Sequence, residues 1–485
     1  MLKKELQMER KMVQHTRIVC TLGPASDSDE VLRAMVRAGM DVARLNFSHG
    51  DHATHAARIA RVRRIAREED ATLALLGDLQ GPKIRIGEIA GGAAQLATGA
   101  TFTLTTRDVP GDAAVARIDF PELPAAVRVG DRILIADGLL ELRVLAADAT
   151  DVQTQVINGG ELRPRKGVNL PGVPLKISAL TAKDRADVEF AVTQDLDYLA
   201  LSFVRRAEDV VELKQLIAAR AGTIPVIAKI EKPEAMEQID AILAASDGVM
   251  VARGDLGVEV SAEQVPLFQK LIIRKANAQG KPVITATQML ESMIENPRPT
   301  RAEASDVANA ILDGTDAVML SAETAVGKYP AQAVAMMARI GDVMEASQQF
   351  QACLRKFGDD AMSITDAIGN ATCEIAEQLR AKLIVTSTSS GFAARMISRH
   401  RPMTPILAVT ASEKTQRRLA LVWGVHASLI ARAETMDGIV QESIAAAEAR
   451  GLVQPGDLVV ITGGVPAGIS GRTNMIQVRV VGEKI

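Results

Sequence analysis

The sequence predicts an α/β protein whose main body is a closed (β/α)8 TIM barrel, with a small β domain inserted into it and an α/β domain after it. Three observations support this prediction. Short apolar runs rich in β-branched residues alternate with amphipathic helical segments, one long stretch of different character interrupts them, and a new α/β pattern begins near residue 344. Eight strand–helix pairs in succession fit a closed barrel better than an open, doubly wound sheet.

The eight predicted barrel strands are continuous runs of Val, Ile and Leu, as expected for parallel strands that are buried on both faces. They cover residues 17–23, 41–48, 72–79, 198–204, 225–231, 248–255, 282–289 and 317–323. Helix-start signals stand between them, for example at 27–30 and 299–303. We therefore assign residues 1–81 and 179–345 to the barrel domain.

Residues 82–178 separate the third strand from the fourth and have a strand-like pattern of their own. Apolar and polar residues alternate at 101–105, 132–135 and 140–144, which is the period of a strand with one buried face. Asp137-Gly138 lies between the last two runs and predicts a type I′ hairpin. We expect a small β-barrel domain at the chemical face of the main barrel, where it can act as a lid.

Residues 346–485 are predicted to form a carboxyl-terminal α/β domain, with parallel strands at 382–387, 405–410 and 457–463. A polar loop follows the first of these strands, and backbone amides at a helix start attract phosphate. The candidate phosphate-binding residues are Thr386, Thr388, Ser389, Ser390 and Gly391. An ordinary polar helix cap and turn is the alternative interpretation of this loop.

The composition is that of a large soluble protein that acts on small molecules. Of its 485 residues 47% are hydrophobic, and the formal net charge of −3 gives no signal for nucleic-acid binding. No apolar stretch reaches the roughly 18 residues of a membrane span, and the amino terminus lacks a secretory signal. Three cysteines without paired spacing favour a reducing compartment. We predict a cytoplasmic protein that binds neither nucleic acid nor membrane.

Polar residues close several of the predicted barrel strands. Lys229 and Glu231 end the fifth strand, Asp255 follows the sixth, and Thr287 follows the seventh. The carboxyl ends of barrel strands meet at one open face, so these four side chains are expected to share a pocket. Two carboxylates beside an ammonium suit Mg2+, because this ion takes oxygen ligands and keeps positions open for substrate oxygens.

Two further strand ends carry charged and polar groups. The run 44–50, Arg-Leu-Asn-Phe-Ser-His-Gly, ends the second strand with a guanidinium, an amide and a hydroxyl that can hold a phosphate or carboxylate. The run 78–85, Asp-Leu-Gln-Gly-Pro-Lys-Ile-Arg, ends the third strand with a carboxylate and two cations as the chain leaves for the inserted domain. Both runs extend the predicted pocket.

These motifs identify a family, because the chain resembles pyruvate kinase throughout its length. The resemblance is carried by long ordered runs at 44–50, 166–172, 286–293, 297–303 and 319–324. It implies a barrel, a β lid inserted after the third strand, and a carboxyl-terminal regulatory domain, usually in a homotetramer. The activity that it implies is phosphoryl transfer from phosphoenolpyruvate to ADP, giving pyruvate and ATP, as the final step of glycolysis.

The resemblance also implies roles for the strand-end residues. Glu231 and Asp255 would hold Mg2+ or Mn2+, and Lys229 and Arg44 would stabilise the transferred phosphoryl group, since this chemistry depends on positioning and charge neutralisation. The substrate carboxylate would meet the amides of Gly254 and Asp255 and the Thr287 hydroxyl.

Further positions match groups that act on the enolate and on the nucleotide. Thr287 or Ser321 would help relay the proton that the enolate needs. Arg85, Lys166 and Asn46 match positions that contact the nucleotide in the family. Closure of the lid would then complete the site and exclude water.

One departure from the family concerns the monovalent cation. Relatives that depend on K+ read Gly-Pro-Glu-Ile-Arg after the third strand, whereas this chain has Lys83 in place of the Glu. A fixed ammonium supplies positive charge where a carboxylate would help recruit K+. We therefore predict that K+ is not required. The positions that match the K+ ligands of those relatives are Asn46, Ser48, Asp78 and the Leu79 carbonyl.

Allosteric regulation is a further implication of the resemblance. The loop 388–391 matches the loop that grips a sugar phosphate in fructose-bisphosphate-activated relatives, but Phe392-Ala393 replaces residues that add contacts there. A phosphorylated sugar or AMP is the expected effector, with the Gly-rich loop 463–471 closing over it.

Two other functions were compared with the kinase. A metal-dependent 2-keto acid aldolase or lyase also places a Glu and an Asp at barrel strand ends, although it would not need Lys166 and the inserted lid. A sugar-phosphate sensor without catalysis would have no reason to keep Lys229, Glu231, Asp255 and Thr287 together.

Overall fold

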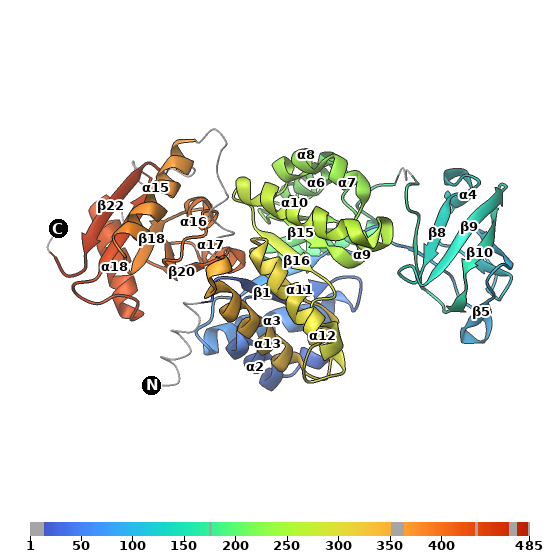
Figure 1. The fold of residues 1–485 in the computed structure, drawn as a ribbon, viewed down its shortest axis with the longest axis horizontal. Helices are drawn as coiled ribbons and strands as arrows, with labels where there is room; N and C mark the ends of the chain where they lie inside the picture. Colours follow the sequence, from blue (N-terminus) through green and yellow to red (C-terminus); the bar gives the residue numbers. More distant parts are fainter. Residues whose placement is uncertain (1–13, 174–176, 351–362, 432–434, 465–472, 484–485) are drawn as a thin grey trace.

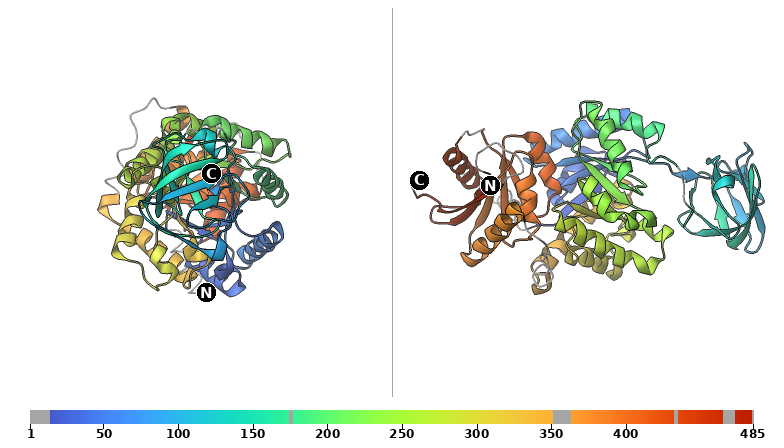
Figure 2. Two further views of the ribbon diagram at one scale, coloured as in Figure 1. Left: turned by 90° about the vertical axis from the view of Figure 1, so that its right-hand side faces the viewer. Right: turned by 90° about the horizontal axis from the view of Figure 1, so that it is seen from above.

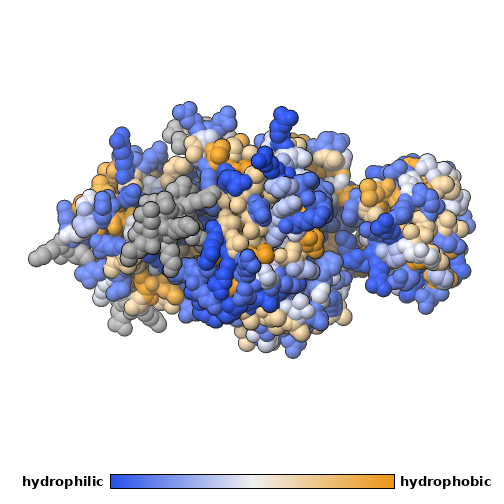
Figure 3. All heavy atoms as spheres, turned by 90° about the horizontal axis from the view of Figure 1, so that it is seen from below, coloured by the Kyte–Doolittle hydropathy of each residue, from blue (hydrophilic) through white to orange (hydrophobic). Residues whose placement is uncertain are grey.

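The computed structural model describes residues 14–173, 177–350, 363–431, 435–464 and 473–483. Three bodies follow one another along the long axis: the carboxyl-terminal domain, a central barrel and the lid (Figure 1). The lid stands clear of the barrel except at its connecting segments when seen from above (Figure 2). Seen from below, polar residues dominate the surface, and the lid is joined to the barrel through a narrower neck (Figure 3).

The central barrel consists of parallel strands in the closed order β1-β17-β16-β15-β14-β13-β3-β2. Their bounds are β1 Arg17–Thr21, β2 Val42–Asn46, β3 Ala74–Asp78, β13 Tyr198–Leu201, β14 Val226–Ile230, β15 Gly248–Ala252, β16 Val283–Ala286 and β17 Ala317–Leu320. Each strand lies inside one of the eight predicted runs. The predicted barrel is therefore confirmed, and the interior is filled by side chains such as Val19, Leu76 and Met250.

Helices pack around the barrel and bury their apolar faces against its strands. They are α2 Asp29–Ala38, α3 His52–Glu68, α5 Ala182–Thr193, α6 Ala207–Ala218, α8 Ile239–Ala245, α10 Val265–Ala278, α11 Arg301–Leu312 and α13 Pro330–Glu345. Ser28 caps α2 by accepting the Val31 N–H, and Thr300 forms a capping box with Glu303 on α11. Short helices follow three of the strands: α7 Pro233–Glu237, α9 Arg253–Glu259 and α12 Ala322–Ala325.

The inserted lid has a hydrophobic core of its own, which includes Phe102, Leu142 and Val152. Its seven-stranded sheet runs in the order β4-β12-β8-β9-β10-β6-β7, and β5 pairs with β11 beside it. The bounds are β4 Ile84–Arg85, β5 Ala94–Leu96, β6 Thr101–Thr105, β7 Val115–Arg117, β8 Arg132–Ile135, β9 Leu140–Ala147, β10 Asp151–Asn158, β11 Gly160–Leu162 and β12 Gly167–Asn169, with the short helix α4 Leu123–Ala126.

The predicted hairpin between β8 and β9 is present in the lid. The Leu139 N–H donates to the Ala136 carbonyl at 3.2 Å. Asp137 and Gly138 at the centre of the turn have φ values of 56° and 88°, the positive values that a type I′ turn requires.

The carboxyl-terminal domain is a five-stranded sheet in the order β20-β19-β18-β21-β22, with helices on both faces (Figure 1). The strands are β18 Leu383–Ser387, β19 Ile406–Thr410, β20 Val425–Leu429, β21 Leu458–Gly463 and β22 Met475–Val480, and the helices are α15 Ile364–Gln378, α16 Phe392–Ser398, α17 Glu413–Arg418 and α18 Met436–Ala449. The three predicted parallel strands, β18, β19 and β21, are confirmed. The sequence did not reveal the two edge strands β20 and β22.

Buried polar contacts fasten this domain to the end of the barrel opposite the lid. Arg401 is 3% exposed. It pairs with Asp316 at 2.9 Å, donates to Asn277 at 3.0 Å and lies over the Trp423 ring. None of the helices in the described part of the chain combines the length and the apolar character that crossing a bilayer demands.

Candidate active site

The Lys229 amine lies at the centre of the mouth of the barrel, at the end of β14. Its Nζ is 2.8 Å from Glu231, 3.2 Å from Asp78 and 2.7 Å from the Ser202 hydroxyl. The Lys229 side chain is 12% exposed. Burial disfavours the charged amine, but the two carboxylates outweigh that effect and raise the pKa of Lys229. The amine is therefore a fixed positive charge.

Arg44 approaches the same carboxylate from β2. Its Nε donates to Asp78 at 2.7 Å, and its Nη1 donates to the Thr21 hydroxyl at 2.8 Å. Burial alone would raise the pKa of Asp78, but Lys229 and Arg44 overcome this effect and lower it. Arg44 and Lys229 thus share the buried carboxylate of Asp78, which holds both cations at the mouth of the barrel.

Glu231 and Asp255 are the two carboxylates of the predicted metal site. Glu231 is 1% exposed and accepts the Phe203 N–H at 2.9 Å. Burial raises the pKa of Glu231 against the opposing effect of Lys229, and the negative charge of Asp255 raises it further. Asp255 lies on the first turn of α9 with a side chain that is 31% exposed. The Asp255 carboxylate is therefore near enough to Glu231, across the mouth of the barrel, for its charge to affect the pKa of Glu231.

This donor set fits a hard divalent ion. A cation between Glu231 and Asp255 would relieve the like-charge repulsion that raises the pKa of Glu231. The described residues contain no group of three or more His, Cys, Asp or Glu side chains placed to hold a metal. Two carboxylates suit Mg2+, which keeps water and substrate oxygens as its other ligands.

Thr287 and Gly254 lie together on the neighbouring side of the mouth. The Gly254 N–H donates to the Thr287 hydroxyl at 2.7 Å, and that hydroxyl donates to the Ala286 carbonyl at 2.6 Å. The backbone φ of Thr287 is 70°, a value that residues other than glycine rarely adopt. Arg253 holds this turn by donating to the Thr287 carbonyl at 2.7 Å while it pairs with Asp306. This role of Arg253 was not predicted from the sequence.

Ser321 follows β17 at the same end of the barrel. Its N–H donates to Glu323 at 2.7 Å, and Glu323 also accepts the Leu290 N–H. Within the described ranges, no hydrogen bond joins the Ser321 hydroxyl to Lys229, Glu231 or Asp78.

Three of the four groups that match a K+ site, those of Asp78, Leu79 and Asn46, already bind protein groups. Asp78 pairs with Arg44 and Lys229, and the Leu79 carbonyl accepts the Ser202 hydroxyl at 2.7 Å. The Asn46 side chain accepts the Ser48 N–H at 3.1 Å. Lys83 lies nearer the metal site, with its Nζ 3.9 Å from Asp255.

Arg85 and Lys166 belong to the part of the lid that is nearest the barrel. Arg85 is the last residue of β4 and pairs with Gly167 on β12, directly after Lys166. Lys166 is exposed, and Arg85 donates to the Arg165 carbonyl at 3.0 Å. Both cations therefore stand on the lid rather than in the Lys229 cluster.

The sequence also missed two residues at the end of β13. The Ser202 hydroxyl links Lys229 to the Leu79 carbonyl, and the Phe203 N–H holds Glu231. Phe203 reaches Glu231 because its φ is 55°. The one available signal was a serine at the end of an apolar strand, in the same position as the other site residues.

The predicted effector loop connects β18 to α16 at the other end of the molecule. The Gly391 N–H donates to the Thr388 hydroxyl at 2.9 Å, and the Ser389 carbonyl accepts the Thr415 hydroxyl. Thr386 is fully buried, and in the described structure its hydroxyl has no hydrogen-bond partner. Most of the predicted closing loop 463–471 lies outside the described residues.

A cavity of about 540 Å³ lies between this loop and the floor of the barrel. Its lining includes Ser390, Gly391, Lys281, Arg395 and Arg418. The cavity is therefore rich in cations and adjoins the predicted effector loop.

Comparison with known proteins agrees with this geometry. A family model described as "Pyruvate kinase, barrel domain" matches residues 13–334, and "Pyruvate kinase, alpha/beta domain" matches residues 366–479. A pyruvate kinase of Geobacillus stearothermophilus is 50% identical over 97% of this chain and 81% of its own length. One from Clostridium acetobutylicum is 44% identical over 97% of this chain and all of its own length.

A solved structure of a pyruvate kinase from Cryptosporidium parvum matches with a TM-score of 0.90 and 36% identity over 97% of each chain. Sequence, domain models and three-dimensional fold thus agree along nearly the whole chain, and the two curated relatives named above are bacterial. This chain belongs to the pyruvate kinase family.

Proposed function

We propose that the chain transfers a phosphoryl group from phosphoenolpyruvate to ADP, giving pyruvate and ATP, with Mg2+ or Mn2+ as cofactor. One observation carries the proposal. A buried ammonium, Lys229, is held between Asp78 and Glu231, and Asp255 faces them across the mouth of the barrel. With a divalent ion bound and with Arg44 beside it, this arrangement would neutralise the charge of a moving phosphoryl group without supplying a nucleophile.

Glu231 and Asp255 would hold the divalent ion, which when bound supplies positive charge to the oxygens of the substrate. The Lys229 amine stabilises the phosphoryl group and the enolate oxygen, and Arg44 steadies the phosphate. The substrate carboxylate meets the amides of Gly254 and Asp255. For this contact, the Thr287 hydroxyl turns its proton from the Ala286 carbonyl to the substrate carboxylate, and the Gly254 N–H leaves the hydroxyl to donate to the substrate.

Protonation of the enolate falls to Thr287 or Ser321 acting through water, since both follow barrel strands at this face. Arg85 and Lys166 on the lid, together with Asn46 on the barrel, would contact the nucleotide. Lid closure brings these groups to the mouth of the barrel and excludes the water that would otherwise accept the phosphoryl group.

A coupled assay for pyruvate tests the reaction directly. Purified protein with phosphoenolpyruvate and Mg2+ is expected to form pyruvate only when ADP is present, with one ATP for each pyruvate. Pyruvate that forms equally fast without ADP would support a lyase on the same barrel instead. Absence of pyruvate under both conditions would support a sensor without catalysis.

The enzyme is expected to need no monovalent cation, because Lys83 supplies a fixed ammonium 3.9 Å from Asp255, and Asp78, the Leu79 carbonyl and the Asn46 side chain already bind protein groups. Activity in a buffer whose only monovalent cation is tetramethylammonium should match the activity in K+. Lys83→Glu should create a K+ requirement, whereas Lys83→Gln controls for loss of the side chain. A strict K+ requirement in the unaltered protein would contradict the proposal.

We further propose regulation by a phosphorylated sugar or AMP at Thr386, Thr388, Ser389, Ser390 and Gly391, supported by the cationic cavity beside this loop. The functional units are taken as residues 1–81 with 179–345, 82–178 and 346–485. We also infer a homotetramer that acts in the cytoplasm, as is usual for this family.

A further inference from the structure

The joint between the lid and the barrel contains a buried carboxylate that belongs to neither the metal site nor the proposed substrate contacts. This residue is Glu259, the last residue of α9, and it is 8% exposed. Its Oε1 accepts the side-chain amide N–H of Asn169 at 2.7 Å. Asn169 is the last residue of β12 in the lid and is 9% exposed. One hydrogen bond therefore links lid and barrel away from solvent.

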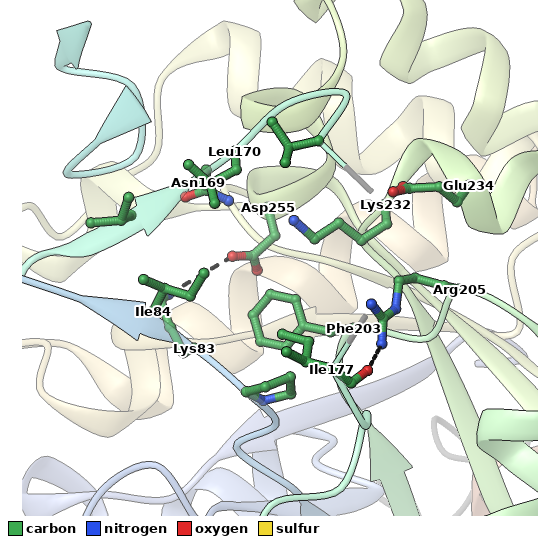
Figure 4. A pocket seen from close by; sticks show the side chains of 13 residues that line it. Lys83, Ile84, Asn169, Leu170, Ile177, Phe203, Arg205, Lys232, Glu234 and Asp255 are labelled. Carbon is green, nitrogen blue, oxygen red and sulfur yellow. Dashed lines mark hydrogen bonds and ion pairs between the residues drawn. The ribbon is translucent and has the colours of Figure 1, made fainter. Parts of the chain in front are cut away.

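The same Glu259 oxygen forms an ion pair with Lys232 of the barrel. Lys232 has a side chain that is 12% exposed, and its Nζ lies over the Phe203 ring at 5.7 Å from the centroid. Figure 4 shows the side chains of Asn169 and Lys232 directed toward one another from the two sides of the joint, close to Asp255. Glu259 thus holds a neutral donor from the lid and a charged donor from the barrel.

The two elements that meet at this joint, α9 of the barrel and β12 of the lid, each also carry or adjoin residues of the proposed active site. On the barrel side, α9 carries Asp255 one turn before Glu259. Glu259 and the candidate metal ligand therefore share one short helix. On the lid side, Asn169 ends the strand that follows Lys166, and Gly167 of that strand pairs with Arg85. The position of β12 therefore sets where both proposed nucleotide ligands stand relative to Asp255.

A buried carboxylate is suited to hold such a joint. Hydrogen bonds to a charged group are stronger than those between neutral groups, and they are strongest where water is excluded. The ion pair with Lys232 fixes Glu259 on the barrel, which leaves Asn169 as the contact that the lid makes or breaks.

We propose that Glu259 is a positioning residue that latches the lid to the barrel through Asn169 and so places Lys166 and Arg85 for the nucleotide. The inference rests on the proposed function in one respect, that the lid residues bind ADP. Glu259 does not touch the reacting atoms. Its effect is on the orientation of the lid, and breaking the latch weakens ADP binding while phosphoenolpyruvate binding on the barrel is retained.

The test exchanges the donor and the acceptor of the latch. Asn169→Asp places a second carboxylate against Glu259 and should push the lid away. Glu259→Gln added to that variant restores a donor opposite the new carboxylate, which can also pair with Lys232. Asn158→Asp is the matched control, because Asn158 is an exposed lid residue whose side chain bonds only the Leu139 carbonyl among the described contacts.

Two readouts separate lid orientation from catalysis. The first is the distance distribution between spin labels at Val129 of the lid and Leu267 of the barrel, which are 74% and 66% exposed, with the native cysteines replaced. The second is the KM for each substrate. Asn169→Asp should lengthen and broaden the distances and raise the KM for ADP about tenfold, with the KM for phosphoenolpyruvate unchanged, and the double variant should reverse both effects.

An unchanged distance distribution in Asn169→Asp would overturn the latch, as would a folded double variant that fails to recover. If Asn169→Asp does not fold, Asn169→Ala removes the lid donor alone and is judged by the same two measurements. The distance measurement does not require activity. A chain that moves its lid as expected but does not use ADP would refute the proposed function and leave the latch standing.

Discussion

Lys229→Met is expected to lower kcat by about 10³-fold or more while the protein still binds its divalent ion. Methionine keeps the length and the apolar stem of the lysine but removes the ammonium that lies 2.8 Å from Glu231 and 3.2 Å from Asp78. The transition state then loses a fixed charge in a site from which water is excluded, and no other group replaces it. Steady-state kinetics at saturating Mg2+, phosphoenolpyruvate and ADP measures the loss.

Two controls show that such a loss is chemical rather than structural. Arg44 still pairs with Asp78 in the variant, so the fold should be retained and thermal unfolding should remain cooperative. Lys275→Met removes an amine that pairs with Asp240, away from the active site, and should leave kcat unchanged. A Lys229→Met enzyme with near-normal kcat would refute the assignment of Lys229 to the transition state.

Arg401→Met is expected to lower the free energy of unfolding by about 3–5 kcal/mol. The Arg401 side chain is 1% exposed, pairs with Asp316 and donates to the Gly314 carbonyl and to Asn277. Its removal leaves Asp316 as a buried charge with one cation fewer, and it also removes a cation that lies 5.0 Å from the Trp423 ring. Denaturant unfolding followed by Trp423 fluorescence reports directly on this junction.

Arg399→Met provides the comparison for this variant. Arg399 pairs with Asp366 at 2.6 Å within the carboxyl-terminal domain, and its side chain is 20% exposed. Because the pair is more accessible to solvent, the expected loss is smaller, up to about 1 kcal/mol. Equal stability of Arg401→Met and the unaltered protein would contradict the view that this cluster fastens the domain to the barrel.

The fold was predictable from the sequence wherever strands are buried on both faces. The eight barrel strands and the central strands β18, β19 and β21 read as continuous apolar runs, and each lies inside its predicted range. The edge strands β20 and β22 escaped prediction for a physical reason. Polar residues interrupt the apolar run in both strands: β20 contains His426 and Ser428, and β22, most of whose residues are half-buried, contains Gln477 and Arg479.

The site was predictable to the extent that strand order determines it. Lys229, Glu231, Asp255 and Thr287 were found because they follow apolar strands, and the barrel places all such positions at one mouth. The contacts that tune them were not predictable. Phe203 contacts Glu231 through its backbone N–H, and this contact depends on a positive φ. The side-chain type of Phe203 does not indicate either feature. Glu259 contacts Asn169 because the end of β12 in the lid lies next to the end of α9 in the barrel, and the sequence pattern does not predict this contact.

We infer that Glu231 and Asp255 together hold one divalent ion beside Lys229. Titration of Mn2+ followed by electron paramagnetic resonance measures this binding without requiring turnover. We expect one Mn2+ site per chain, with affinity lowered at least about tenfold in both Glu231→Gln and Asp255→Asn. Affinity should be unchanged in Asp240→Asn, because the Asp240 carboxylate is 72% exposed and pairs with Lys275. Retention of full Mn2+ affinity by either active-site variant would contradict it.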